Sequence, residues 1–228
     1  MIYPNWPVSK QIKAFNSTKT IPFQDYPFTT PPKILKQVHA NKLVHADKLV
    51  HADKILAPKK TEADGLFTST PNVICTILTA DCLPLFFAHQ QSLQVGALHC
   101  GWRSLASNIL NNMLTILLAD IKNYYFWLGP SILQENFEVE QDLLDNFMHH
   151  GYSVDFLAKV VKPHPTKAHK FLFDLAKLTK LRLQELGALE QNIFLSNLCT
   201  VTDASFHSHR ASKGQNKERN YNCIWIES

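Results

Sequence analysis

The chain has 228 residues, 45% of them hydrophobic and 18% charged, which is the composition of a globular protein long enough for one large domain. The formal net charge is +4 and the basic residues are spread along the chain, which favours small anionic ligands and argues against a nucleic-acid partner. The five cysteines lack a paired spacing, the first residues do not resemble a signal peptide, and the apolar runs are too short to span a bilayer. We therefore expect a cytoplasmic protein with reduced thiols and no membrane partner.

The N-terminal segment of the chain is expected to be poor in regular structure. Residues 1–32 are rich in Pro, Thr and aromatic residues, which predicts an irregular N-terminal cover, and a strand is expected over 33–39. A near-perfect hexad repeat follows, VHANKL–VHADKL–VHADKI over 38–55. If the repeat is extended, its histidines lie on one face, because side chains alternate along a strand.

The rest of the chain alternates strand and helix signals. Apolar runs predict strands, and longer amphipathic segments predict helices, one of them capped by Ser104 and another closed by Gly187. The expected strands are 63–68, 73–78, 85–88, 93–98, 124–128, 193–196 and 222–226, and the expected helices are 105–120, 140–150 and 174–186. Because the two types mix without a linker, we expect one α/β (α+β) domain over residues 1–228, a layered sandwich of mixed sheets flanked by helices.

Two short motifs carry the clearest chemical signal. Cys82 follows Ala80 and Asp81 beyond one apolar run, and His99 ends another, before Cys100, Gly101, Trp102 and Arg103. Neighbouring strand ends would bring this thiolate and this imidazole to one spot. With the upstream His39 the set becomes His, Cys, His, which suits zinc with a fourth position left open. His45 and His51 of the repeat compete with His39 for the same role.

Polar residues beside these motifs are candidates for further roles. Asp81 would orient a ligand or transfer protons. Arg103, at the start of a helix, has a bidentate guanidinium suited to phosphate or carboxylate, and Arg210 is a second candidate for an anion.

With these motifs the chain resembles the YfiH-type laccase-domain proteins, which are described as multicopper polyphenol oxidases and also as purine nucleoside phosphorylases. The resemblance runs from about Ile34 to Ile226. The matching motifs are KQVH (36–39), ADGLFT (63–68), TADCLP (79–84), GALHCGWR (96–103), LGPSI (128–132) and a C-terminal run from Cys199 to Arg210. We add Gln37, from the first motif, to Arg103 and Arg210 as a candidate for binding substrate.

The resemblance implies a single α/β domain with one zinc held by His39, Cys82 and His99. It also implies phosphorolysis of adenosine, inosine, guanosine and methylthioadenosine, with phosphate as co-substrate, and hydrolytic deamination of adenosine. Copper is the less favoured metal. The chain departs from the family in lacking a Gly-rich N-terminal stretch, in carrying the hexad repeat, and in reading GWRS at 101–104 and SHRA at 208–211.

Two other classes of function remain open. A copper-dependent polyphenol oxidase would need further His-rich copper sites, which only the repeat offers. A non-catalytic, zinc-stabilised binding module would need a closed site with a fourth ligand such as Cys100, although close Cys or His spacing of the structural type is absent from the sequence.

Overall fold

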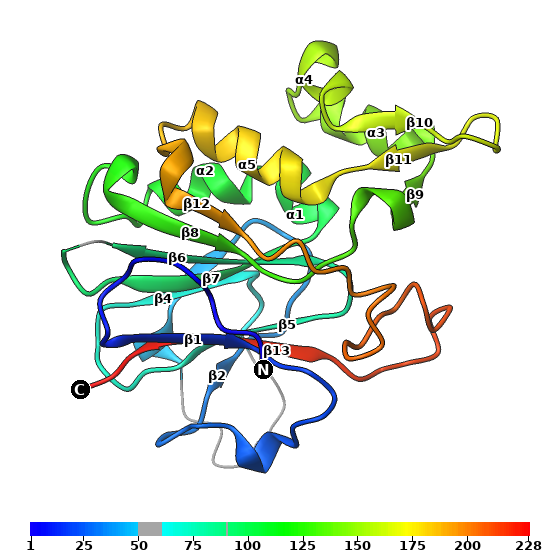
Figure 1. Ribbon diagram of the computed structural model, residues 1–228. Helices are drawn as coiled ribbons and strands as arrows, with labels where there is room; N and C mark the ends of the chain where they lie inside the picture. Colours follow the sequence, from blue (N-terminus) through cyan, green and yellow to red (C-terminus); the bar gives the residue numbers. More distant parts are fainter. Residues whose placement is uncertain (50–60, 90) are drawn as a thin grey trace.

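The computed structural model describes residues 1–49, 61–89 and 91–228, and its elements are stacked in layers (Figure 1). A six-stranded sheet lies in the middle, a four-stranded sheet covers one of its faces, and helices cover the other. A small third sheet with two helices projects from the helical layer (Figure 1). This arrangement confirms the expected fold class of mixed sheets flanked by helices.

The central sheet has the strand order β12-β8-β6-β7-β4-β3. β6 pairs antiparallel with β7 and β8, and β4 with β7, whereas the two edge strands β3 and β12 pair in parallel. Every residue of β6 and β7 is buried, because both faces of the sheet are covered. The bounds are Leu43–His45 (β3), Gly65–Thr68 (β4), Leu83–His89 (β6), Val95–Cys100 (β7), Tyr124–Leu128 (β8) and Ile193–Leu195 (β12).

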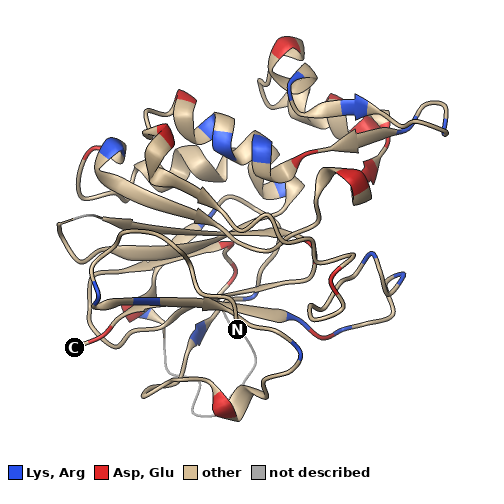
Figure 2. Ribbon diagram, viewed as in Figure 1, with Lys and Arg blue, Asp and Glu red and all other residues tan. Residues whose placement is uncertain are grey.

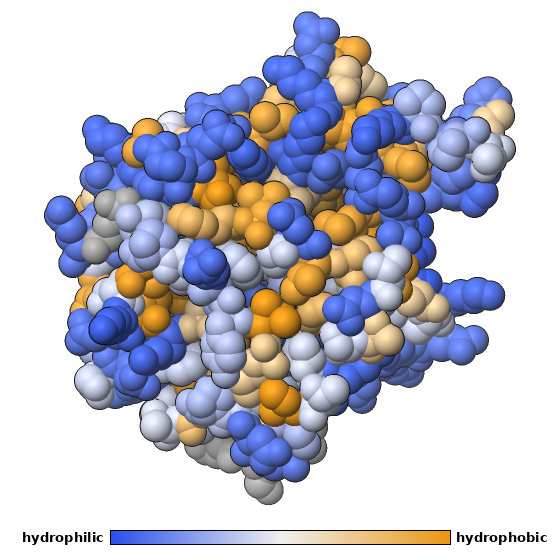
Figure 3. Space-filling model, in the orientation of Figure 1, coloured by the Kyte–Doolittle hydropathy of each residue, from blue (hydrophilic) through white to orange (hydrophobic). Residues whose placement is uncertain are grey.

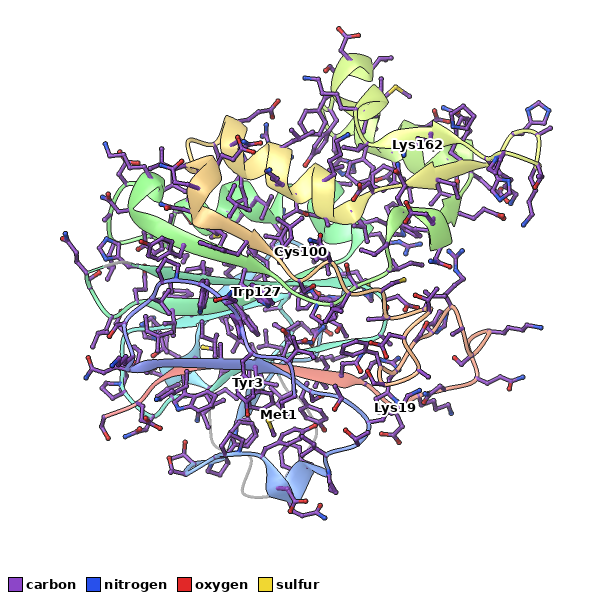
Figure 4. The ribbon with its side chains drawn as sticks, viewed as in Figure 1. Met1, Tyr3, Lys19, Cys100, Trp127 and Lys162 are labelled. Atoms are coloured by element: carbon purple, nitrogen blue, oxygen red, sulfur yellow. The ribbon has the colours of Figure 1, made fainter. Side chains whose placement is uncertain are left out.

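The second sheet has the order β1-β13-β5-β2, with bounds Ile12–Asn16 (β1), Lys33–Ile34 (β2), Cys75–Thr79 (β5) and Asn220–Ile226 (β13). β1 corrects the expectation of an irregular cover over residues 1–32, since all five of its residues pair antiparallel with the C-terminal strand. Trp127 on β8, labelled in Figure 4, packs between the two sheets and donates its indole N–H to Asn16 Oδ1 at 3.0 Å.

The helical layer contains α1 (Trp102–Ala106), α2 (Ile109–Leu114) and α5 (Leu175–Glu185). The expected helix over 105–120 is therefore wrong in its bounds. The first helix begins earlier, with Gly101 at the N-cap in place of Ser104, and Asn108 at φ 65° separates it from the second. Asparagine tolerates this left-handed conformation better than most residues, so the break follows from a residue whose side chain is short and polar.

The third sheet, of order β10-β11-β9, was not expected from the sequence. Its strands are β9 (Glu138–Val139), β10 (Val161–Pro163) and β11 (Phe171–Phe173), and the accompanying helices are α3 (Gln141–His149) and α4 (Val154–Ala158). Strands of two or three residues are too short for a period-two pattern to be visible. Short 3-10 turns cover Phe23–Asp25, Ala46–Lys48, Ile121–Asn123, Gln134–Asn136 and Glu190–Asn192.

Charged and hydrophobic residues are mixed in the views shown. Lys and Arg alternate with Asp and Glu over all layers (Figure 2), and in the face shown in Figure 3 hydrophobic side chains lie scattered among hydrophilic ones. No helix in the described part of the chain is long and apolar enough to cross a membrane.

Candidate metal centre

Three side chains from distant parts of the chain meet at one end of the central sheet. His39 lies in a turn after β2, Cys82 in the connection that passes from β5 in one sheet to β6 in the other, and His99 near the end of β7. Their potential ligand atoms all lie within 4.8 Å of one another. β6 and β7 deliver Cys82 and His99 to the same end because they are antiparallel neighbours, with Leu83 opposite Cys100.

The three groups differ in their access to solvent. His99 is 3% exposed, Cys82 is partly buried, and His39 is exposed and closes the site from the outside. Cys82 Sγ lies 4.0 Å from His39 Nε2, and the two imidazole rings meet edge to face with centroids 4.6 Å apart. The cluster therefore reaches from the buried interior at His99 to the protein surface at His39.

The turn that carries His39 is shaped by a carboxylate. His39 has φ 58°, a left-handed conformation that is uncommon for residues other than glycine. Asp64, immediately before β4, is 0% exposed and accepts the backbone N–H groups of Val38, His39 and Ala40 at 3.2, 3.0 and 2.7 Å. The same carboxylate accepts from His99 Nδ1 at 2.8 Å. His99 Nε2 is therefore the nitrogen left to face Cys82.

These contacts shift the pKa values of Cys82, His99 and Asp64. Burial raises the pKa of the Cys82 thiol, but the charge of His99 and bonds to both histidines outweigh it and lower the pKa to about 6. Burial lowers the pKa of His99, but Cys82 and Asp64 raise it to about 9. Burial also raises the pKa of Asp64, yet its bonds to His99 and the backbone hold it below the usual value. Cys82 is thus a thiolate at neutral pH, the form that ligates metals.

The donor set fits a zinc ion on two observations. One thiolate and two imidazoles are the borderline-soft donors that zinc prefers, and three protein ligands leave a fourth position free. Gly101, which follows β7, keeps the centre of the site clear, since a Cβ there would lie 3.1 Å from both Cys82 Sγ and His39 Cδ2. Within residues 1–49, 61–89 and 91–228 this is the one cluster of three or more potential ligands at such distances.

The rival histidine His45 does not join the cluster. It lies in β3, where its Nδ1 is 3.4 Å from Asp47 Oδ2 and its ring packs against Phe67 at 4.9 Å between centroids. The first two repeats thus differ in backbone conformation, so the condition under which their histidines would share one face, an extended repeat, does not hold at His39. His51 lies outside the described residues.

Cys100, the candidate fourth ligand of a closed site, is buried in the core. It follows His99 on β7, so its side chain takes the opposite face of the strand. There it packs with Leu83 and Leu105 between the sheet and the helices (Figure 4). Burial raises the pKa of its thiol, which disfavours the thiolate. The described structure therefore favours an open set of three ligands.

Asp81 is held by the C-terminal loop. Its Oδ1 accepts from the Thr200 hydroxyl at 2.7 Å and its Oδ2 from the Arg210 backbone N–H at 2.6 Å. The residue has φ 86° and is 8% exposed. Asp81 thereby fixes the turn that presents Cys82, and its role in proton transfer stays a prediction.

The three candidates for substrate binding differ in availability. The Arg103 guanidinium stacks 4.1 Å above the Trp102 ring, is exposed, and forms no ion pair with another residue that the structure describes. Arg210 donates to the carbonyls of Asn136 and Glu138 at 3.3 and 3.1 Å. Gln37 exchanges two hydrogen bonds of 2.8 Å with the backbone of Leu78. Arg103 is therefore the one most readily available to an anion.

Asp64 is the residue that sequence reasoning missed. It was visible only as a member of the ADGLFT motif, although a carboxylate between Ala63 and the apolar start of a strand must find several donors when buried. That requirement could have indicated a structural or site role. Its partners, at positions 38–40 and 99, could not be identified from spacing.

Comparisons with known proteins identify the family of the chain. The family described as multi-copper polyphenol oxidoreductase laccase matches residues 23–227. The purine nucleoside phosphorylase of Haemophilus influenzae is 28% identical over 99% of both chains. The purine nucleoside phosphorylase YfiH of Escherichia coli is 32% identical over 72% of this chain and 64% of its own length.

Solved structures show the same fold. The Neisseria meningitidis protein NMB0706 superposes with a TM-score of 0.83 at 25% identity, over 100% of this chain and 99% of the other. The Bacillus licheniformis protein YfiH superposes with a TM-score of 0.81 at 21% identity, over 95% and 93% of the two chains. The layered arrangement is therefore shared with proteins of quite different sequence.

Proposed function

This chain belongs to the family described as multi-copper polyphenol oxidoreductase laccase, and on that premise we propose that it is a zinc-dependent purine nucleoside enzyme. Its reactions would be phosphorolysis of adenosine, inosine, guanosine and methylthioadenosine, and hydrolytic deamination of adenosine. The names of the relatives support the nucleoside class. The observation that carries the proposal is the open cluster of His39, Cys82 and His99.

The residues of the chain take the following parts. His39, Cys82 and His99 would hold zinc, which when bound supplies Lewis acidity toward the purine or toward water. Arg103 would hold phosphate, whose oxygen attacks the ribose C1′ while the bond to the purine breaks and the purine leaves with the electron pair and gains a proton. The exposed guanidinium of Arg103, in the first turn of α1 and stacked on the Trp102 ring, supports this role.

Arg210, Gln37 and Asp81 have supporting parts in the proposal. Arg210 would bind the substrate anion only after releasing the carbonyls of Asn136 and Glu138. Gln37 would contact substrate only by giving up its bonds to Leu78. Asp81 would pass a proton only if the Thr200 hydroxyl or the Arg210 amide moved away. All three roles require breaking existing hydrogen bonds, whereas Arg103 has no ion pair to give up among the described residues.

The test is chromatography of zinc-loaded protein incubated with adenosine, with and without phosphate. Adenine and ribose 1-phosphate formed only with phosphate would demonstrate phosphorolysis, and inosine formed without phosphate would demonstrate deamination. No product under either condition would contradict the proposal.

A copper-dependent polyphenol oxidase is the second candidate, and the family's description favours it. A His₂Cys set can hold one copper ion. Oxygen reduction by a laccase needs several coppers, and the described part of the chain offers one cluster. Several coppers per chain together with phenol oxidation would favour this candidate over the nucleoside enzyme.

A further inference from the structure

We propose that Asp64 is the positioning residue that assembles the metal centre, because one carboxylate holds two of the three ligands at once. This inference rests on the proposed zinc function. Asp64 Oδ1 accepts from His99 Nδ1 at 2.8 Å and from the His39 backbone N–H at 3.0 Å. Asp64 Oδ2 accepts from the backbone N–H groups of Val38 and Ala40 at 3.2 and 2.7 Å.

The bond to His99 decides which nitrogen meets the metal. The donor to Asp64 is Nδ1, so Nε2 is the nitrogen that faces Cys82 and that a metal would bind after its proton is released. The Asp64 carbonyl also accepts the His99 backbone N–H at 2.7 Å, which holds the two residues side by side at the junction of β4 and β7. A metal-bound histidine whose other nitrogen donates to a carboxylate is fixed in orientation and is the stronger ligand.

The bonds to residues 38–40 decide where His39 lies. Three consecutive backbone N–H groups converge on the carboxylate, and this requires the left-handed conformation of His39 at φ 58°. The far side of the turn is held by Asn41, whose Nδ2 donates to the Ser107 carbonyl at 2.6 Å and whose carbonyl accepts from Asn112 Nδ2 at 2.9 Å. The turn is therefore fixed at both ends before any metal binds.

The isosteric variant Asp64→Asn isolates this function. A carboxylate has two acceptor oxygens and here receives four N–H donors, whereas an amide has one acceptor oxygen and turns an NH₂ toward the remaining donors. In either orientation of the amide, two of the four bonds are lost and replaced by a donor facing donors. The change removes half of the orienting bonds and leaves the volume of a fully buried side chain almost unchanged.

Asp47→Asn is the matched control. Asp47 accepts from the hydroxyls of Thr68 and Thr70 at 2.6 Å each and lies 3.4 Å from His45 Nδ1, so it is a second aspartate beside a histidine. It differs from Asp64 in having no contact with the three ligands.

The measurement is zinc affinity, by competition with a chromophoric chelator, on metal-free protein whose fold is checked by circular dichroism. We expect Asp64→Asn to weaken zinc binding by about ten- to hundredfold, the usual effect of losing such a partner, and Asp47→Asn to leave it unchanged. Equal zinc affinity of Asp64→Asn and wild type would overturn the positioning role and leave the zinc enzyme intact. A wild type that binds no zinc would overturn both.

NMR of isotope-labelled, zinc-loaded wild type decides the point if Asp64→Asn does not fold. We expect the proton of His99 on Nδ1 and the chemical shift of a metal-bound nitrogen at Nε2. Metal binding through Nδ1 would overturn the positioning role.

Discussion

The thiol of Cys82 and the imidazole of His99 favour each other's charged forms. Burial alone would raise the pKa of Cys82 and lower that of His99. The attraction between them, with contributions from His39 and Asp64, brings the pKa of the thiol to about 6 and that of the imidazole to about 9. Between these values the metal-free site holds a thiolate beside an imidazolium. Cys82 is thereby already deprotonated at neutral pH, whereas His99 must release the proton of Nε2 when a metal binds.

This pairing predicts the pH dependence of thiol reactivity. In metal-free protein we expect alkylation of Cys82 by iodoacetamide to rise through about pH 6, since the thiolate is the reactive form. Cys100 and Cys223 are buried with raised pKa values and stay unreactive in the folded protein. Mass spectrometry of the labelled peptides measures this. A midpoint near 9 for Cys82 would contradict the pairing.

The same shifts predict how the stability of the metal-free protein depends on pH. The lowered pKa of Cys82 contributes stability above its ordinary value of 9.0 that is lost as the pH falls through about 6. The raised pKa of His99 contributes stability below its ordinary value of 6.5 that is lost as the pH rises through about 9. We therefore expect the contribution of the pair to Tm to be largest between about pH 6 and pH 9. In Cys82→Ala this maximum in the dependence of Tm on pH should disappear, and an unchanged profile would contradict the expectation.

Cys82→Ser should abolish both zinc binding and nucleoside turnover, because a serine hydroxyl stays protonated and is a poor zinc ligand. Cys199→Ser is the matched control, since Cys199 Sγ accepts from Asn136 Nδ2 at 3.5 Å and a hydroxyl can do the same. Metal analysis and product chromatography measure the two effects. A metal-loaded, active Cys82→Ser protein would refute the assignment.

Arg103→Ala should raise the KM for phosphate while affecting adenosine deamination less, because phosphate takes part only in phosphorolysis. The substitution also removes the guanidinium from the Trp102 ring, an exposed contact worth about 0.5–1 kcal/mol. Arg219→Ala, which removes a guanidinium bonded to the carbonyls of its own loop, is the control. Equal losses of the two activities in Arg103→Ala would argue against phosphate binding.

Gly101→Ala should weaken zinc binding, because the added Cβ would lie 3.1 Å from Cys82 Sγ and push it or the His39 ring away. Gly151→Ala separates this effect from a general loss of stability. Its Cβ would meet nothing within 4 Å, but its φ of 92° makes any side chain strained. We expect a lower Tm with normal zinc affinity for Gly151→Ala, so weakened zinc binding in both variants would refute a local effect at Gly101.

The sequence alone predicted the middle of the fold, and the candidate ligands Cys82 and His99, which it placed at neighbouring strand ends, do lie in one cluster. The strand over 124–128 matches β8, and the apolar runs before Cys82 and His99 are strands, because continuous apolar segments are the pattern of doubly covered strands. The sequence did not distinguish His39 from His45 and His51 as the third candidate ligand, because the copies of the repeat have nearly the same local sequence. Asp64 distinguishes the copies, because among the described residues its carboxylate accepts hydrogen bonds from the first copy and not from the second.

Contacts between distant segments explain what the sequence did not predict. β1 is a strand because it pairs with β13 at the other end of the chain, and nothing in residues 12–16 indicates that partner. The contacts of Asp64 with residues 38–40 and His99 are likewise long-range. The break at Asn108 is the exception, since an asparagine inside an expected helix was itself a local warning.

The most direct test of the account is zinc titration of chelator-treated protein, followed by release of ribose 1-phosphate from adenosine and phosphate. The account predicts no activity without metal, a rise that ends at one zinc per chain, and no activity in Cys82→Ser at any zinc concentration. Full activity in metal-free protein, or activity that appears only with several copper ions per chain, would contradict it.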